Sequence, residues 1–110
     1  RIVLTRSPKK YFKQLVRNQL EFSNETPKKL IERMATLGYK KILLVGGATI
    51  NGLFLKHNLV DELYLTIEPR IFGIGKNITE GQLLNKSLQL ISIKKLNKTG
   101  TLLLKYQLNK

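Results

Sequence analysis

Residues 41–55 read Lys-Ile-Leu-Leu-Val-Gly-Gly-Ala-Thr-Ile-Asn-Gly-Leu-Phe-Leu, and this stretch decides the expected fold. The apolar run 42–45 predicts a buried strand, and after Gly46 and Gly47 the apolar residues recur with helical spacing as far as Phe54. Backbone N–H groups at a helix N-terminus have no intrahelical partner, and the helix dipole is positive there, so this turn predicts an anion site. The alternative is a tight strand-to-helix turn without a ligand, because such turns recur in α/β folds.

Upstream of this stretch, one helix has clear end signals. Thr26 and Pro27 are typical of an N-cap and a first helical position, and Gly38 is typical of a helix end. The core face of this helix is expected to carry Leu30, Ile31, Met34 and Leu37. Short strands are expected at 2–4 and 19–22, whereas the pattern of 11–16 is ambiguous.

Downstream, the pattern changes from helix to strands. A helix over 49–57 is expected to end at Asn58, and the alternating segment 63–68 predicts a strand stopped by Pro69. Two alternating segments, 88–95 and 101–108, predict an antiparallel hairpin turned through 97–100. This order predicts an α/β fold with one mixed sheet flanked by helices, in a single domain over residues 1–110.

The composition limits the classes of function. The absence of cysteine among the 110 residues excludes disulfides, thiolate metal sites and a cysteine nucleophile. No run approaches the roughly 20 apolar residues of a membrane span, and no signal peptide is evident, so we expect a soluble, cytoplasmic protein. The net charge of +13 favours an anionic partner, or else reflects lysine-rich, solvated faces. No segment interleaves basic and aromatic residues as a single-strand nucleic-acid groove does.

The remaining titratable residues do not form a recognisable catalytic set. His57, the single histidine, falls at a helix end, and no metal site is expected. Asp61 and Glu62 enter a strand on opposite faces, and we expect them to hydrogen-bond loop amides. Glu68, at the other end of that strand, is expected to be an exposed edge carboxylate. We therefore assign no catalytic residue.

Three segments in fixed order resemble the carboxy-terminal part of the dihydrofolate reductase-like superfamily, most closely the reductase domains of bacterial riboflavin biosynthesis proteins. They are Leu44-Val-Gly-Gly-Ala-Thr-Ile-Asn-Gly-Leu-Phe-Leu55, Asn58-Leu-Val-Asp-Glu-Leu-Tyr-Leu65 and Ile67-Glu-Pro-Arg-Ile-Phe-Gly-Ile-Gly75. The resemblance extends from Ile2 to the final hairpin. It implies a dihydrofolate reductase-like sheet and an NADPH-dependent reductase, which would transfer hydride to a pteridine-, pyrimidine- or ribosylamino-type small molecule.

The resemblance also implies two cofactor-binding segments. The strand-to-helix turn would receive the pyrophosphate, and its residues are Gly46, Gly47, Ala48, Thr49 and Ile50. The segment after the first strand would flank the adenosine and its 2′-phosphate, and its residues are Thr5, Arg6 and Ser7. A guanidinium such as that of Arg6 pairs with phosphate in fork geometry. Relatives in riboflavin synthesis often carry an acidic residue before the glycine pair, where this chain has Val45.

The family's first strand and its following loop, which supply much of the substrate pocket, have no counterpart in this chain. We therefore expect Arg1 to lie inside a longer protein. A sheet without this neighbouring strand has unpaired edge amides or apolar surface, and we expect a homodimer to cover it. Two other functions remain open: a basic nucleic-acid-binding module, and an inactive structural or dimerisation fragment.

Overall fold

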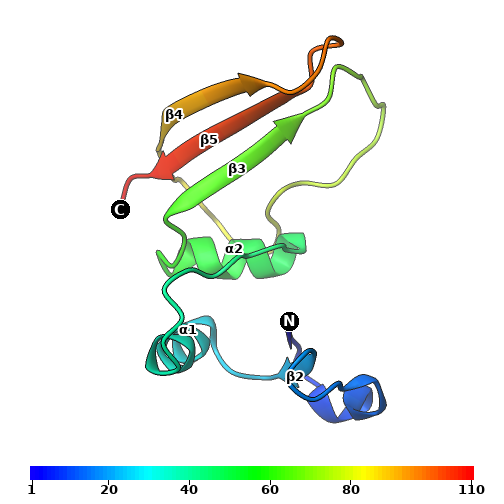
Figure 1. The fold of residues 1–110 in the computed structure, drawn as a ribbon, viewed down its shortest axis with the longest axis vertical. Helices are drawn as coiled ribbons and strands as arrows, with labels where there is room; N and C mark the ends of the chain where they lie inside the picture. The colour runs from blue at the N-terminus through cyan, green and yellow to red at the C-terminus, as the bar shows by residue number, and fades with distance from the viewer. The chain divides into compact units, whose positions relative to one another are not determined.

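Helices and strands follow one another along residues 1–110 of the computed structural model, and the contacts between residues divide the chain into two units, Arg1–Leu44 and Val45–Lys110 (Figure 1). Each unit combines helix and sheet, so the α/β class predicted from the sequence is confirmed. None of the helices has both the length and the apolar character that crossing a membrane requires.

The first unit contains a small parallel sheet. Strands β1 (Ile2–Leu4) and β2 (Glu21–Ser23) pair in parallel, with Val3 opposite Phe22. The chain between them forms a 3-10 helix, η1 (Pro8–Gln14), which covers most of the segment whose pattern was ambiguous. The ring of Tyr11 from η1 stacks on that of Phe22 from β2, with 5.3 Å between the ring centroids.

Helix α1 (Pro27–Thr36) has the ends that the sequence predicts. The Thr26 hydroxyl oxygen accepts a hydrogen bond from the Lys29 amide at 3.3 Å, and Gly38 has a φ of +91° just past the helix end. Leu30 and Met34 are buried as predicted. Leu37 was expected on the same face but is 62% exposed, because it is the C-cap and follows the last helical residue.

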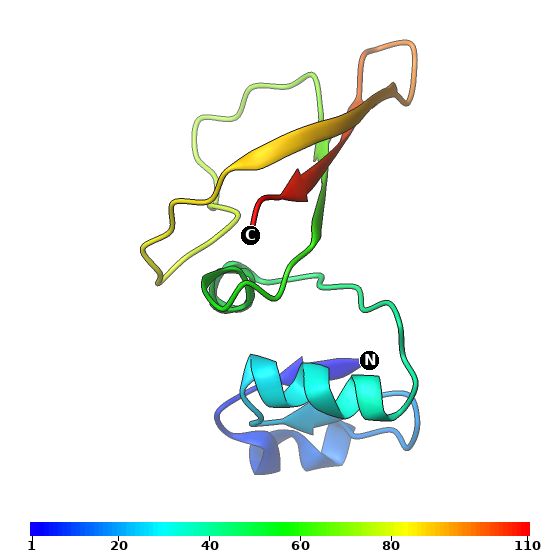
Figure 2. The ribbon, with the colours of Figure 1, turned by 90° about the vertical axis from the view of Figure 1, so that its left-hand side faces the viewer.

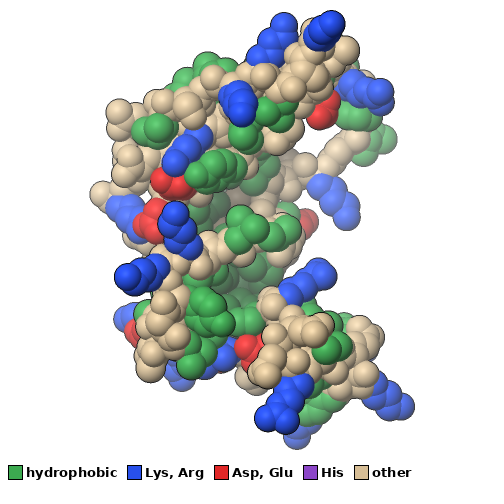
Figure 3. All heavy atoms as spheres, viewed as in Figure 1, with side chains coloured by type: hydrophobic (Ala, Val, Ile, Leu, Met, Phe, Trp, Pro, Cys, Tyr) green, Lys and Arg blue, Asp and Glu red, His purple; other side chains and the backbone are tan.

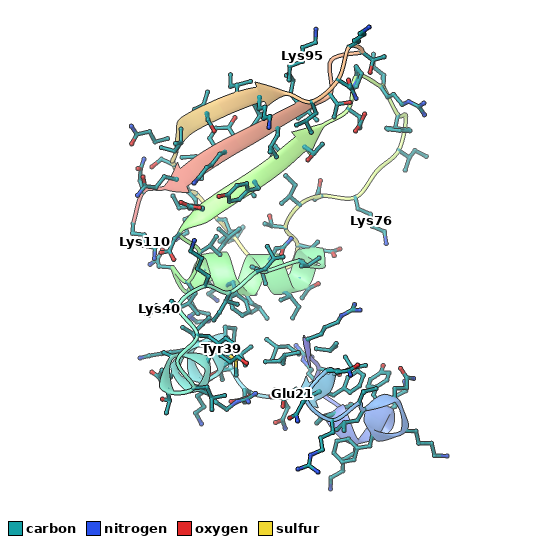
Figure 4. The ribbon with its side chains drawn as sticks, viewed as in Figure 1. Glu21, Tyr39, Lys40, Lys76, Lys95 and Lys110 are labelled. Atoms are coloured by element: carbon teal, nitrogen blue, oxygen red, sulfur yellow. The ribbon has the colours of Figure 1, made fainter.

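An ion-pair cluster joins α1 to the segment around β2. The Arg33 side chain of α1 donates two hydrogen bonds to Glu25 Oε1, at 3.0 and 2.7 Å, and one to Glu25 Oε2 at 3.0 Å. Arg33 also donates a hydrogen bond at 3.1 Å to Oε1 of Glu21, a residue of β2 that is labelled in Figure 4. The hydrogen bonds from Arg33 lower the pKa of the Glu25 carboxyl group, because they stabilise its charged form.

We expect Glu25→Gln to lower the free energy of unfolding of Arg1–Leu44 by about 1 kcal/mol at neutral pH, as for a part-buried charged hydrogen bond. A carboxylate whose pKa is lowered by folding contributes stability above its pKa in the unfolded chain and loses that contribution as the pH falls through its pKa in the folded chain. The stabilities of the wild type and the variant should therefore converge in acid. Urea unfolding at about pH 7 and about pH 3 measures this.

The matched control for Glu25→Gln is Glu32→Gln, which removes an exposed carboxylate of α1 that has no ion-pair partner. This variant should change the stability little at either pH. A loss in Glu25→Gln that is equally large at both pH values would contradict the role given to the Glu25 carboxylate.

The second unit consists of helix α2 (Ala48–Lys56) and a three-stranded antiparallel sheet. Strands β3 (Glu62–Ile67), β4 (Leu88–Lys95) and β5 (Leu102–Leu108) have the spatial order β3-β5-β4, which confirms the predicted terminal hairpin (Figure 2). Helix α2 ends at Lys56 with His57 as its C-cap, and Asn58 just after it has a left-handed φ of 55°, as predicted. Phe54 of α2 and the β5 residues Leu104 and Leu108 are the buried apolar side chains of this unit.

The predicted strand over residues 42–45 is absent. This segment has no regular secondary structure, and the side chains of Leu43 and Val45 are 85% and 84% exposed. A strand requires a neighbour to satisfy its backbone N–H and C=O groups, and none of the strands in residues 1–110 pairs with this segment. The strands consequently form two sheets, where the sequence predicted one mixed sheet.

Candidate functional site

The glycine turn, residues 46–50, comprises Gly46, Gly47 and the first three residues of α2. Gly46 has a φ of +103°, a conformation that favours glycine, and the peptide bond between Gly46 and Gly47 is cis. Gly47 is the N-cap of α2 and provides no side-chain hydrogen bond to the helix. The sequence prediction of a helix that starts directly after the glycine pair is therefore confirmed.

The first amides of α2 are available to a ligand. The first helical hydrogen bond of α2 runs from the Asn51 amide to the Gly47 carbonyl oxygen, at 2.9 Å. The amides of Ala48, Thr49 and Ile50 precede this bond and have no intrahelical partner. Gly47 and Thr49 are exposed, so an anion can reach this end of the helix from solvent.

The charges near the turn in the sequence also favour an anion. No Asp or Glu occurs between Glu32 and Asp61, whereas Lys40 and Lys41 precede the turn. The acidic residue whose backbone contacts the first turn of α2 is Glu80, which donates its amide to the Ala48 carbonyl oxygen at 3.1 Å. The positive end of the dipole of α2 therefore lies at the turn, where it favours an anion.

The segment 78–80 closes over the first turn of α2, a contact that the sequence did not predict. The Asn51 side chain donates a hydrogen bond from Nδ2 to the Ile78 carbonyl oxygen at 3.0 Å. Figure 1 shows the chain after β3 returning to α2, where this bond forms. The sequence does contain a signal for this contact, because Asn51 and Gly52 are two poor helix formers inside a short helix.

The other predicted cofactor segment, Thr5, Arg6 and Ser7, follows β1 in the first unit. The Thr5 amide donates to the Ser23 carbonyl oxygen at 2.8 Å, and the Ser7 amide donates to the Thr5 hydroxyl oxygen at 3.2 Å. The Arg6 side chain is exposed and forms no ion pair. Its role toward a 2′-phosphate stays a prediction.

The acidic residues around β3 contact side chains. Asp61 pairs with Lys110, so the prediction that it binds loop amides is wrong. Glu62 accepts a hydrogen bond from the Tyr64 hydroxyl at 3.0 Å and pairs with Lys105 at 3.1 Å. Glu68 is exposed as predicted, and it accepts a hydrogen bond at 2.9 Å from the buried Thr101 hydroxyl. These contacts hold the sheet and its hairpin in place and leave no paired carboxylates for acid–base chemistry.

A shallow cavity of about 370 Å³ lies at the end of β5. Asp61, Gln107, Leu108, Asn109 and Lys110 line it. None of these residues belongs to the glycine turn, and the acid among them is already paired with Lys110. The cavity therefore adds nothing to the candidate anion site.

Basic side chains occur in both units. On the face shown in Figure 3, Lys and Arg side chains form several separate groups, some of which lie beside Asp or Glu side chains. Figure 4 likewise shows Lys76 and Lys95 on separate segments of the second unit. Nucleic-acid binding through the +13 charge therefore stays an alternative prediction beside solvated lysine faces.

Comparison with known proteins identifies the family. The structure superposes on the crystal structure of a candidate riboflavin biosynthesis protein from Shewanella sp. PV-4, with a TM-score of 0.78 at 20% sequence identity. The match covers 99% of this chain and 60% of that protein, so this chain spans about three fifths of its length. The family model of the RibD C-terminal domain matches residues 1–102. This chain therefore belongs to the RibD C-terminal domain family, the reductase-type domains of riboflavin biosynthesis proteins.

Proposed function

We propose that this chain is the cofactor-binding part of an NADPH-dependent reductase that transfers hydride to a pteridine-, pyrimidine- or ribosylamino-type substrate of the riboflavin pathway. The observation that supports the cofactor is the start of α2, which no side chain caps and where the amides of Ala48, Thr49 and Ile50 have no intrahelical partner. A diphosphate fits this donor set, because amides and the helix dipole stabilise it without a side-chain cation.

In this function the chain binds and orients, while the nicotinamide supplies the hydride when NADPH is bound. The glycine turn would hold the diphosphate and so fix the position of the rest of the cofactor. We assign no catalytic residue among residues 1–110, and we propose that further substrate contacts come from polypeptide outside them. The expected homodimer stays a prediction, which light scattering at high protein concentration tests.

Ligand-dependent stability tests the cofactor. A ligand that binds only the folded chain stabilises it by about 2.7 kcal/mol at a concentration of one hundred times its Kd. We therefore expect NADPH to raise the melting temperature by several degrees, and NADH to raise it less because NADH lacks the 2′-phosphate. A melting temperature that responds to neither dinucleotide would disprove the proposed cofactor.

The variant Thr49→Asp separates binding from stability. An aspartate in the first turn of a helix stabilises the helix by about 0.5 kcal/mol, because its charge complements the dipole. The same charge repels a diphosphate held by the neighbouring amides. We therefore expect an unchanged or higher melting temperature without ligand and a loss of most of the NADPH-induced shift, both measured by thermal denaturation.

The control for Thr49→Asp is Asn85→Asp, which makes the same change in charge at an exposed position between β3 and β4. This variant should keep the NADPH-induced shift. An equal shift in both variants would indicate that the diphosphate binds away from the start of α2.

A further inference from the structure

The Asn51 side chain connects two segments that are 27 residues apart in the sequence. Its Nδ2 donates to the Ile78 carbonyl oxygen at 3.0 Å, while its own backbone amide closes the first turn of α2 on Gly47 at 2.9 Å. The same side chain lies against the glycine turn. A Cβ placed on Gly46 would be 3.3 Å from Asn51 Nδ2 and 3.5 Å from its Oδ1.

Two further contacts hold the segment 78–80 on the first turn of α2. The Glu80 amide donates to the Ala48 carbonyl oxygen at 3.1 Å. The Glu80 carbonyl oxygen lies 2.7 Å from the position that a Cβ on Gly52 would occupy, which shows how closely the two backbones approach. The first turn of α2 is thus fixed from outside the helix, and Asn51 supplies the side-chain part of this contact.

None of these contacts uses the amides of Ala48, Thr49 and Ile50, which remain available as donors. The arrangement of these amides depends on the backbone of the glycine turn, which has no side chains of its own at Gly46 and Gly47 to hold it. Asn51 is the polar side chain that lies against this turn and is itself anchored on Ile78.

We propose that Asn51 is a positioning residue of the cofactor site: by bridging the glycine turn and the Ile78 carbonyl group, it holds the free amides of α2 in the arrangement that binds the diphosphate. This inference rests on the proposed function of the turn. A turn that is not held in place must be ordered when the ligand binds, and this cost lowers the affinity, so a loosened turn should bind measurably less well.

Direct binding measurements on the 110-residue chain test this proposal. NADPH fluorescence gives the Kd, and amide ¹H–¹⁵N spectra report whether the resonances of Ala48, Thr49 and Ile50 shift on titration. We expect Asn51→Ala to raise the Kd of NADPH about tenfold, equivalent to about 1.4 kcal/mol. The matched control is Asn77→Ala, which truncates an exposed asparagine one residue before Ile78 and should bind like the wild type.

A second variant distinguishes positioning from general stability. Asn51→Gln keeps the amide donor but displaces it by one methylene, so its melting temperature should stay near that of the wild type while the Kd rises about threefold. If Asn51→Ala does not fold, the Kd of Asn51→Gln alone tests the positioning role. The positioning role is overturned if Asn51→Gln binds NADPH with wild-type affinity and Asn51→Ala either does the same or cannot be measured. The proposed cofactor is then unaffected. A wild type that does not bind NADPH, with no shift of the three resonances, overturns both.

Discussion

Phe54→Ala is expected to lower the free energy of unfolding of Val45–Lys110 by about 3–4 kcal/mol, as for aromatic truncations in other cores. Phe54 is the most buried apolar side chain of the chain, with 4% of its surface exposed. Leu104 and Leu108, each 8% exposed, are the other buried apolar residues of the same unit. So small a core cannot close over the space that a missing ring leaves, and both the lost burial and the remaining cavity reduce stability.

Chemical denaturation, followed by circular dichroism, measures the loss in Phe54→Ala. A folded domain of this size is stable by roughly 5–10 kcal/mol, so the variant should unfold at a much lower urea concentration. The control is Leu83→Ala, in the same unit, whose side chain is fully exposed and should change the stability by less than about 0.5 kcal/mol. A Phe54→Ala variant as stable as Leu83→Ala would show that α2 does not anchor this core.

Helices α1 and α2 and the hairpin could be predicted because their signals are local. Thr26 and Pro27 begin α1, Gly38 follows its end, and Asn58 follows the end of α2, all through contacts within a few residues. The turn at 97–100 is equally local, since the Asn97 side chain accepts hydrogen bonds from the amides of Gly100 and Thr101 at 3.0 Å. Nearby residues therefore set the ends of these elements, whereas the stability of helices this short comes mostly from packing.

The strand predicted over 42–45 shows where local patterns fail. Its residues have the apolar run that is typical of a buried parallel strand, but a strand exists only when another strand pairs with it. The pattern of Leu43 and Val45 indicates what these side chains suit, whereas their exposure shows that residues 1–110 supply no partner. No local pattern contains that information.

The candidate site likewise has one part that the sequence predicts and one part that it does not. The glycine turn could be predicted, because Gly46 and Gly47 lie between an apolar run and a helical pattern. The contact with Ile78 and Glu80 could not, because it joins residues far apart in the sequence through backbone carbonyl and amide groups that every residue has. Side-chain identity alone gives such contacts no signature, except for the unusual Asn51-Gly52 pair inside α2.

Gly52→Ala is expected to lower the free energy of unfolding of Val45–Lys110 by about 2 kcal/mol, against the trend for helices. In an exposed helix interior alanine is more favourable than glycine by about 1 kcal/mol. Here the new Cβ would lie 2.7 Å from the Glu80 carbonyl oxygen and 3.3 Å from the Gln82 Cγ atom. The first contact is with backbone, which cannot rotate away, so the segment 78–80 must move and the steric cost exceeds the gain in helix propensity.

The same movement should affect binding, because it pulls the Ile78 carbonyl group away from Asn51 and the Glu80 amide away from Ala48. We therefore expect Gly52→Ala to lose both several degrees of melting temperature and a large part of the NADPH-induced shift. The matched control is Gly75→Ala, whose added Cβ meets open space and whose stability should change by less than about 0.5 kcal/mol. A Gly52→Ala variant that is more stable than the wild type would mean that helix propensity dominates at this position and that the segment 78–80 does not hold the start of α2.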